Sequence, residues 1–269
     1  MHAPDQLAII AGNGVYPLVL ARGARVAGVR KILALAFEGE TDAELGRLVD
    51  EICWLLVGQL NRMLSILRDA GITRAIMAGQ IAPRNLFDLH PDWRALLLVA
   101  KMRQRNAESI FRAIASELDK IGVALLPATT FLEDLVAEKG LIAGPKLSRR
   151  EKSDIDLGWD IAQKIAALNI GQTLIVKNGT VLAIEGFDGT NETIRRGGAL
   201  GRSGAVMIKL AKPNQDMRFD VPVIGPETIS VAVEAKIRVI ALEADRTLLL
   251  EKADVIRAAQ TAGISVLGH

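Results

Sequence analysis

The feature that most constrains the fold is a repeated order of short apolar run, glycine turn and helical pattern. In the first repeat, Leu-Ala-Ile-Ile-Ala at residues 7–11 is followed by Gly-Asn-Gly at 12–14 and by an apolar-periodic stretch from Pro17 to Ala27. Proline is harmless near a first helical turn, because the amide that it lacks has no partner inside the helix. Strands that alternate with helices imply parallel pairing. We therefore expect an α/β protein of two domains, the first a Rossmann-like parallel sheet.

The rest of the N-terminal half continues this alternation. Strands are expected at 31–37, 51–57, 74–78 and 123–127, and helices at 61–70, 93–102 and 107–121. Gly71 and Gly122 directly follow two of the helical patterns, and glycine commonly ends a helix. Residues 138–146 combine glycine, proline and lysine and indicate a connector, so the domains are expected at 1–140 and 146–269.

The C-terminal half predicts a mixed α/β domain, which we expect to be the catalytic one. Asn178-Gly179 between two apolar runs is a strong hairpin signal, and Ser148 with Glu151 has the spacing of a capping box that opens a helix. Strands are expected at 173–177, 180–185, 205–211, 238–242, 248–250 and 264–267, and helices begin near 148, 191, 226 and 252.

Composition limits the kinds of partner. The 269 residues carry a net charge of only +2 without a block of Lys or Arg, which argues against nucleic acid and favours a small-molecule partner. The single cysteine, Cys53, excludes an intrachain disulfide and fits a reducing cytoplasm. No run approaches the roughly 18 apolar residues of a membrane span, and no signal-like N-terminus is found. A cytoplasmic protein is therefore expected.

Histidine is scarce, because the chain has only His2, His90 and His269. A zinc site or a histidine-rich two-metal centre is therefore not expected. Any metal chemistry must depend on carboxylates and carbonyls, which favours magnesium.

The turn Gly12-Asn13-Gly14 offers backbone amides and a positive helix end to an anion such as phosphate. As a dinucleotide fingerprint it lacks the third glycine, because Pro17 stands in its place. Glu38 follows the second strand at a distance suited to binding a ribose. A nicotinamide-dependent oxidoreductase and a purely structural turn both stay open.

A second glycine pattern is Gly79-Gln80, at the end of a strand, and Gly58-Gln59 repeats it. Glycine allows a ligand to approach closely, and glutamine supplies the donor and acceptor that a nucleobase or sugar requires. An ordinary strand-ending turn is the alternative.

Asp188, Thr190 and Asn191 lie where a hairpin strand gives way to a helix. Either Thr190 or Asn191 is the N-cap of this helix, or the segment forms a site for an anion or hydroxyl at the helix start, with Arg195 and Arg196 one turn later.

Charged side chains concentrate in Lys-Pro-Asn-Gln-Asp-Met-Arg-Phe-Asp-Val-Pro, residues 212–222, directly after a buried strand. The end of such a strand is where open α/β sheets place ligand chemistry. Asp216 and Asp220 lie four residues apart, together with Lys212 and Gln215, and the prolines keep the segment out of a helix. A solvated loop is the alternative.

The helical pattern at 93–102 is apolar on nearly every side and is flanked by Arg94, Lys101, Arg103 and Arg105. It indicates either a core helix with snorkelling ends or a surface that lines an acyl-chain tunnel or touches a membrane.

A resemblance to a known family is carried by segments in order along nearly the whole chain. They are Ile-Ala-Gly-Asn-Gly at 10–14 with Pro17, Ala-Gly-Gln at 78–80, Leu-Gly-Trp-Asp-Ile-Ala at 157–162, Gly-Gln at 171–172, Val-Leu-Ala-Ile-Glu-Gly-Phe-Asp-Gly-Thr at 181–190, the segment 212–222, and Ile-Gly-Pro at 224–226. Together they resemble the UDP-2,3-diacylglucosamine diphosphatases of lipid A biosynthesis, of the type unrelated to calcineurin-like phosphoesterases. Asn13 stands where that family often has glycine.

The resemblance implies two domains that bind the substrate, magnesium dependence, and hydrolysis of the diphosphate bond to release UMP and 2,3-diacylglucosamine 1-phosphate (lipid X). It assigns the essential aspartate to Asp220, with Asp216 as the second candidate, and both are expected as catalytic residues and magnesium ligands. Lys209 and Lys212 would offset the developing negative charge.

The remaining substrate-binding set expected from these arguments is Gly12, Asn13, Gly14, Gly79, Gln80, Asp188, Thr190, Asn191 and Gln215, while apolar helices would hold the acyl chains. The expected partner is an amphiphilic nucleotide-sugar lipid, which is compatible with peripheral contact with the inner membrane and with a homo-oligomer. A non-enzymatic nucleotide-sugar or lipid-binding module is the alternative outside enzymes, and the nicotinamide-dependent oxidoreductase is the alternative among them.

Overall fold

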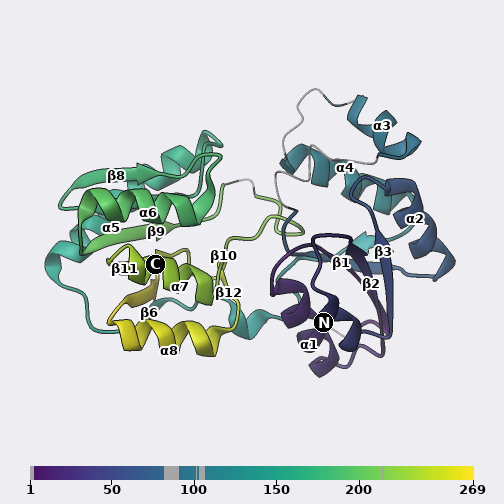
Figure 1. Ribbon diagram of the computed structural model, residues 1–269, viewed down its shortest axis with the longest axis horizontal. Helices are drawn as coiled ribbons and strands as arrows, with labels where there is room; N and C mark the ends of the chain where they lie inside the picture. Colours follow the sequence, from purple (N-terminus) through teal and green to yellow (C-terminus); the bar gives the residue numbers. More distant parts are fainter. Residues whose placement is uncertain (1–2, 82–90, 101, 103–106, 214) are drawn as a thin grey trace. The chain divides into compact units, whose positions relative to one another are not determined.

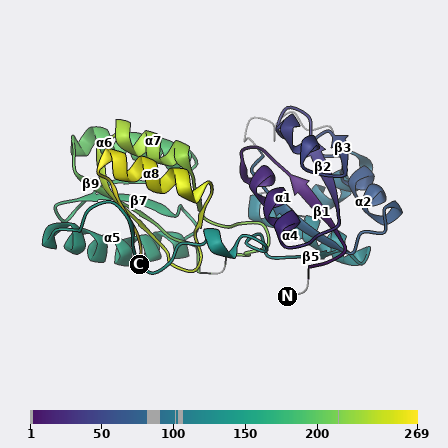
Figure 2. The same ribbon diagram turned by 90° about the horizontal axis from the view of Figure 1, so that it is seen from below.

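The computed structural model describes residues 3–81, 91–100, 102, 107–213 and 215–269 (Figures 1 and 2). His2, His90, Lys101, Arg103, Arg105 and Asn214, which the sequence analysis mentions, lie outside the described residues. The chain divides into two compact units, here called the N-terminal unit (residues 1–132 and 217–220) and the C-terminal unit (residues 133–216 and 221–269).

The N-terminal unit is built on a sheet in the order β3-β2-β1-β4-β5, in which all paired strands are parallel, as the alternation of strands and helices predicted. The strands are β1 (Gln6–Ala11), β2 (Lys31–Phe37), β3 (Glu51–Leu55), β4 (Arg74–Ala78) and β5 (Ala124–Leu125). The helices are α1 (Tyr16–Val26), α2 (Leu60–Asp69), α3 (Trp93–Ala100), α4 (Ala107–Lys120) and the short η1 (Ala43–Arg47).

Helices cover both faces of this sheet, which explains why its strands are apolar without alternation. All five central residues of β2 are buried. Ile10, Leu33 and Leu35 face a core built largely from α2 and α4. The helix α1 contacts β1 and β4, and in Figure 1 it lies apart from α2 and α4.

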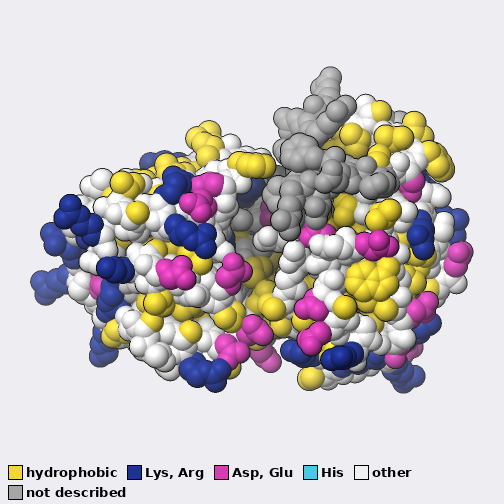
Figure 3. All heavy atoms as spheres, viewed as in Figure 1, with side chains coloured by type: hydrophobic (Ala, Val, Ile, Leu, Met, Phe, Trp, Pro, Cys, Tyr) yellow, Lys and Arg dark blue, Asp and Glu magenta, His cyan; other side chains and the backbone are white. Residues whose placement is uncertain are grey.

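Helix α3 is only partly a core helix. Ala95 is buried and Leu98 packs against the core, but Trp93, Leu96 and Leu97 are 61%, 57% and 51% exposed. Figure 3 shows hydrophobic side chains gathered on the surface at this end of the unit. The interpretation of 93–102 as a core helix therefore holds for one side of it. Within the described ranges, no helix is both long and apolar enough to cross a bilayer.

The C-terminal unit is built on a mixed sheet in the order β13-β11-β9-β7-β8. Its strands are β7 (Thr173–Lys177), β8 (Thr180–Ile184), β9 (Ala205–Lys209), β11 (Ile237–Leu242) and β13 (Ser265–Gly268). Strands β9, β11 and β13 run parallel, whereas β7 is antiparallel to both of its neighbours. The hairpin predicted at Asn178-Gly179 and the capping box of Ser148 with Glu151 are both confirmed.

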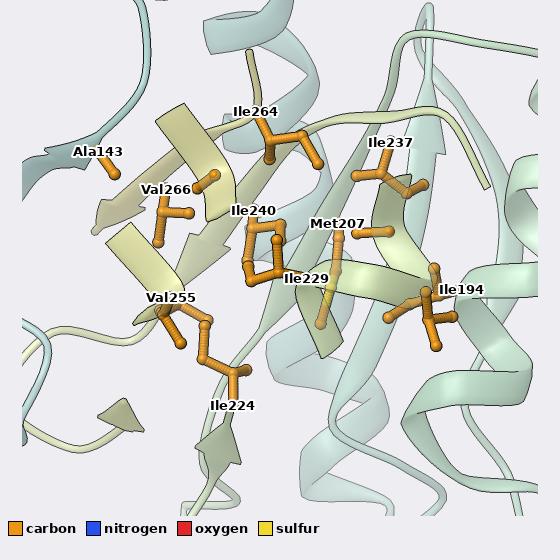
Figure 4. Packing of buried hydrophobic residues seen from close by; sticks show 14 of the residues in the cluster. Ala143, Ile194, Met207, Ile224, Ile229, Ile237, Ile240, Val255, Ile264 and Val266 are labelled. Carbon is orange, nitrogen blue, oxygen red and sulfur yellow. The ribbon is translucent and has the colours of Figure 1, made fainter. Parts of the chain in front are cut away.

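Helices also cover both faces of the mixed sheet. In Figure 2, α5 (Arg149–Ala167) lies on one side, and α6 (Gly189–Gly201), α7 (Pro226–Glu234) and α8 (Lys252–Ala262) lie on the other. Figure 4 shows the core on the second side, where Ile194, Met207, Ile229 and Val255 meet.

Three short elements of this unit were not predicted: η3 (Glu133–Leu135), β6 (Gly140–Ala143) and β10 (Val223–Ile224). The prediction of a connector at 138–146 was wrong where β6 forms. The reason is that β6 packs along β13, and Lys139 forms a parallel bridge with Gly268, a partner far away in the sequence. Strand β10 pairs with β12 (Leu248–Leu249) in a separate two-stranded sheet. The units divide between residues 132 and 133, whereas the boundary was expected at 140–146.

Candidate functional site

Polar side chains gather at one edge of the sheet in the C-terminal unit. Strand β7 is antiparallel to both β8 and β9, so β8 and β9 end at the edge where β7 begins. Lys209 is the last residue of β9, Glu185 follows β8, Thr173 opens β7, and α6 begins at Gly189. Ligand sites of open α/β sheets lie at such carboxyl ends.

Lys209 is a buried lysine, with only 4% of the residue exposed. Its Nζ donates to Thr190 Oγ1 at 2.7 Å and to Thr173 Oγ1 at 3.4 Å. A buried ammonium is costly unless hydrogen bonds and an opposite charge compensate it. Thr190, which lies in the first turn of α6, therefore compensates part of this charge through its hydrogen bond to Lys209.

Glu185 supplies the opposite charge and is 8% exposed. It accepts hydrogen bonds from Thr190 Oγ1 at 2.9 Å and from the Gln172 amide at 3.2 Å. Burial by itself raises the pKa of Glu185, but the Lys209 cation, two threonine hydroxyls and the backbone amide outweigh it and hold the pKa below its ordinary value of 4.5. Glu185 is therefore ionised at neutral pH and forms a charge pair with Lys209.

Two glutamines extend this network toward the predicted catalytic segment. The Gln172 carbonyl accepts the Leu210 amide at 3.0 Å, and Gln172 Oε1 accepts from Gln215 Nε2 at 3.4 Å. Gln215 is 8% exposed, and its Oε1 accepts the Lys212 amide at 2.7 Å. We name Gln172, Thr173, Glu185, Thr190, Lys209 and Gln215 the polar network. It holds the loop that leads to Asp216.

The same loop is held on its other side by Glu243, which follows β11. Glu243 accepts the Ala211 amide at 2.6 Å and forms an ion pair with Arg246 at 3.2 Å. Arg246 also donates to the Lys212 carbonyl at 3.4 Å. A cavity of about 200 Å³ lies beside this anchor. Its lining residues are Trp159, Gln163, Leu210, Ala211, Pro213, Glu243 and Arg246.

The segment 212–222 contains no helix or long strand among its described residues, as its prolines predicted. The segment is shared between the units: Asp216 belongs to the C-terminal unit and Asp220 to the N-terminal unit. Residues 217–220 pack within the N-terminal unit, where the Met217 carbonyl accepts the Ala128 amide at 2.8 Å. The Phe219 ring lies 5.8 Å from that of Phe111, measured between centroids.

Asp188 and Asn191 lie near the polar network but make contacts of their own. Asp188 occupies the N-cap position of α6 without a side-chain capping bond, so the N-cap interpretation of Thr190 or Asn191 was wrong. Hydrogen bonding from the Gly186 amide, together with the Arg196 guanidinium, holds the pKa of Asp188 below its usual range. Asn191 Nδ2 donates to Glu227 Oε1 at 2.9 Å.

In the N-terminal unit, the two predicted glycine turns meet each other. The amide of Gly12 donates to the Ala78 carbonyl at 2.8 Å, and Asn13 and Gln80 form an antiparallel bridge. A Cβ atom on Gly12 would lie 2.4 Å from the Gln80 carbonyl oxygen, and one on Gly79, at φ +92°, would lie 2.6 Å from that of Asn13. The close approach of two backbones therefore requires both glycines.

The Asn13 side chain binds a buried acid rather than Glu38, the acid singled out by the dinucleotide interpretation. Its Nδ2 donates to Glu40 Oε2 at 3.3 Å, and Glu40 is 6% exposed. The Gly12 and Asn13 amides donate to carbonyls of the protein, whereas Gly14 follows them at φ +87° before α1 begins. Nucleotide binding by this turn stays a prediction.

Sequence reasoning selected Thr190, Lys209 and Gln215 but missed the other members of the polar network. Gln172 lies in the quoted Gly-Gln pair, and Glu185 is a charged residue at the end of an otherwise apolar strand. That second pattern is a usable signal, because a carboxylate that the fold buries at the end of an apolar run needs a partner.

Comparison with known proteins gives matches over nearly the whole chain. The family model described as the LpxI N-terminal domain matches residues 6–135, and the model described as the LpxI C-terminal domain matches residues 138–267. The chain is also 29% identical, over 274 residues, to a Caulobacter vibrioides protein named UDP-2,3-diacylglucosamine pyrophosphatase LpxI. That alignment covers 98% of this chain and 97% of the relative.

Two solved structures that match the chain show only weak likeness to it. The biotin carboxylase domain of the Hydrogenobacter thermophilus 2-oxoglutarate carboxylase is 13% identical with a TM-score of 0.28, over 65% of this chain and 35% of that chain. The biotin carboxylase subunit of pyruvate carboxylase is 14% identical with a TM-score of 0.27, over 68% of this chain and 36% of that chain.

Proposed function

This chain belongs to the LpxI family, and on that premise we propose that it hydrolyses the diphosphate bond of UDP-2,3-diacylglucosamine, releasing UMP and 2,3-diacylglucosamine 1-phosphate with the help of magnesium. The observation that carries the proposal is the match of both family domains, in order, together with a named relative aligned over 98% of the chain.

The geometry of the C-terminal unit supports an anionic substrate. The first turn of α6 lies at this sheet edge, and helix N-termini favour negative charge, whereas the charge of the buried Lys209 is already compensated by Glu185. The negative charge of Glu185 stabilises the Lys209 ammonium, and both groups form a hydrogen bond with the Thr190 hydroxyl. We assign the polar network a positioning role: it fixes the loop that carries Lys212 and Asp216.

The donor set fits magnesium bound jointly by protein and substrate. The described residues contain no group of three or more His, Cys, Asp or Glu that could hold a metal ion. Magnesium is commonly bound by one or two carboxylates plus substrate phosphates, so a protein cage is not required. Asp216 and Asp220 would supply these carboxylates, and the bound ion would neutralise charge that develops on the phosphates.

Within this proposal, Asp220 acts either as a magnesium ligand or as the base that positions water. Lys212 offsets negative charge near the phosphates. Asp188 and Asn191 form the edge of the substrate site on the C-terminal unit, while Gly12, Asn13, Gly14, Gly79 and Gln80 bind the nucleotide on the N-terminal unit. Diphosphate hydrolysis suits such a site, because it needs charge neutralisation and a placed water rather than a covalent intermediate.

The first test follows UMP by chromatography after incubating the protein with UDP-2,3-diacylglucosamine and magnesium, with and without chelator. We expect release of UMP that the chelator abolishes. Asp220→Asn should retain substrate binding and lose turnover by about a hundredfold or more. The matched control is Asp156→Asn, an exposed aspartate on α5, which should behave as wild type. A folded wild-type protein that binds substrate without releasing UMP would leave only a binding module.

We also propose that the protein works in the cytoplasm in peripheral contact with the inner membrane. Its proposed substrate is amphiphilic, and α3 exposes Trp93, Leu96 and Leu97 at helical spacing. Sedimentation with anionic phospholipid vesicles should detect binding that Leu96→Ser/Leu97→Ser weakens. Val26→Ser is the control, since Val26 is 91% exposed at the end of α1. Equal vesicle binding by all three proteins would refute a membrane role for α3.

A further inference from the structure

Asp220 belongs to the N-terminal unit, although the residues before and after its short segment belong to the C-terminal unit. The chain joins the N-terminal unit at Met217 and leaves it after Asp220. Residues 217–219 form a turn directly before Asp220. Ordering such a short piece of chain costs conformational entropy, so its conformation depends on the contacts that it makes with the rest of the unit.

The first of these contacts is a hydrogen bond to the backbone of the turn. The Ala128 amide donates to the Met217 carbonyl at 2.8 Å, and the Ala128 carbonyl accepts from the Tyr16 hydroxyl at 2.5 Å. Tyr16 is buried and is the first residue of α1. Ala128 therefore connects the turn to the start of α1, just after the glycine turn at residues 12–14.

This hydrogen bond places the turn at one edge of the parallel sheet. Strands β1, β4 and β5 are parallel, so their carboxyl ends point to the same edge. Ala128 follows β5, while Gly12 and Gly79 follow β1 and β4. The turn that carries Asp220 is thus held at the edge where open α/β sheets bind ligands.

The second contact is made by the ring of Phe219. This ring packs against the core that α2 and α4 form with the sheet, and its centroid lies 5.8 Å from that of Phe111 on α4. Aromatic pairs favour centroid separations of about 4.5–7 Å. Because Asp220 is the next residue, the packing of the Phe219 ring fixes the backbone from which the Asp220 carboxylate extends.

We propose that Phe219 is a positioning residue for Asp220: its ring, packed against Phe111, sets the place of the catalytic carboxylate. This inference rests on the proposed function, in which Asp220 is a magnesium ligand or the base. A misplacement of about 1 Å can cost roughly a hundredfold in rate. Loss of the ring should therefore lower kcat, while KM, which depends on the other substrate-binding groups, should change little.

The test measures kcat and KM for UMP release by wild type, Phe219→Ala and Phe219→Leu, well below the unfolding temperature of each protein. Phe219→Ala should lower kcat about thirtyfold and change KM less than about twofold. Phe219→Leu keeps a large apolar side chain and should recover most of kcat. If Phe219→Ala fails to fold, Phe219→Val takes its place, with the same expected split between kcat and KM.

The matched control is Ile121→Ala. Ile121 packs against the same core, directly after α4 and about 15 Å along the helix direction from Phe111. Its truncation should lower the urea midpoint of unfolding without changing kcat or KM. A loss of kcat in this control equal to that in Phe219→Ala would assign the effect to general destabilisation of the unit and refute the inference.

A double-mutant cycle tests whether Phe219 acts through the Asp220 carboxylate. In the Asp220→Asn background, Phe219→Ala should lower the residual turnover by less than about twofold, because the group that the ring places has already been removed. Phe111→Ala should resemble Phe219→Ala, and the two changes together should cost little more than either one alone.

The outcomes separate failure of the inference from failure of the proposed function. Wild type without UMP release would overturn both, and so would Asp220→Asn with wild-type turnover. Active wild type with an unchanged kcat in Phe219→Ala would overturn the positioning role alone. The same fold loss from Phe219→Ala with and without the Asp220 carboxylate, or a raised KM at unchanged kcat, would also refute it.

Discussion

Replacing Lys209 by methionine tests the central claim about the C-terminal unit, that a buried lysine and Glu185 stabilise each other. The change keeps a long apolar stem and removes the ammonium, which donates to Thr190 at 2.7 Å and to Thr173 at 3.4 Å. A hydrogen bond from a charged donor contributes about 1.5–3 kcal/mol. The longer of the two contacts should contribute little.

The larger cost comes from Glu185, which is left buried without its cation. Breaking a buried ion pair by removing one partner costs about 3–5 kcal/mol. Glu185 keeps hydrogen bonds from Thr190 at 2.9 Å and from the Gln172 amide at 3.2 Å, so we expect the low end, about 3 kcal/mol. The double variant Lys209→Met/Glu185→Gln should be more stable than the sum of the single changes predicts, by about 2 kcal/mol.

The pH dependence has a definite sign. In the wild type the pKa of Glu185 lies below its ordinary value of 4.5, so its contribution is present above that pH and is lost as pH falls through the folded-state pKa. In Lys209→Met burial acts without the cation and should raise the pKa of Glu185. A raised pKa makes the variant relatively more stable at low pH. The stability difference between wild type and variant should therefore shrink from pH 7 to pH 5.

The assay is urea unfolding followed by the fluorescence of Trp159, with Trp54 and Trp93 replaced by phenylalanine so that the signal reports the C-terminal unit. The matched control is Lys177→Met at the other end of β7, where Nζ donates to two backbone carbonyls, each at 2.7 Å. We expect the control to cost about 1 kcal/mol and to show no such pH dependence. Equal costs for both variants, independent of pH, would refute a charge pair between Lys209 and Glu185.

Two further predictions concern the N-terminal unit. Gly79→Ala should destabilise it by about 1–3 kcal/mol, because Gly79 has a φ of +92° and the new Cβ would lie 2.6 Å from the Asn13 carbonyl oxygen. The control is Gly46→Ala, whose new Cβ would have its nearest neighbour atom at 3.8 Å. Similar urea midpoints for the two variants would contradict this prediction. Tyr16→Phe should cost about 1–2 kcal/mol at neutral pH, because the buried hydroxyl donates to the Ala128 carbonyl at 2.5 Å. Burial raises the pKa of Tyr16 above its ordinary 10.0, so this contribution is lost as pH rises past that value, and an unfolding difference between wild type and variant that persists at higher pH would be evidence against it.

Much of the fold was predictable because the local signals agree with the tertiary structure. Residues 31–37 and 74–78 were expected as strands and form β2 and β4 at those bounds, since strands buried on both faces are uninterrupted apolar runs. Elements whose formation depends on a distant partner were harder. Strand β6 packs along β13, and β10 has only two residues and pairs with β12. Neither carries a periodicity of its own.

The residues of the candidate site also differ in whether the sequence alone could predict them. Thr190 was selected because it lies where a predicted strand gives way to a predicted helix, and Lys209 because its cation would offset negative charge that develops on the substrate. Glu185 and Gln172 join them only because antiparallel pairing of β7 with β8 and β9 brings the start of one strand to the ends of the other two. The spacing of these residues along the chain does not predict that pairing.

The sequence by itself determined the alternation of strands and helices, the hairpin, the capping box and the concentration of charge at residues 212–222, because each depends on neighbours within a few residues. Only the tertiary structure decided which distant groups compensate a buried charge, and that Asp216 and Asp220 belong to different units. The physical reason is that burial and charge pairing are properties of the packed chain. A lysine at the end of a strand becomes a buried cation only when other strands and a helix remove the water around it.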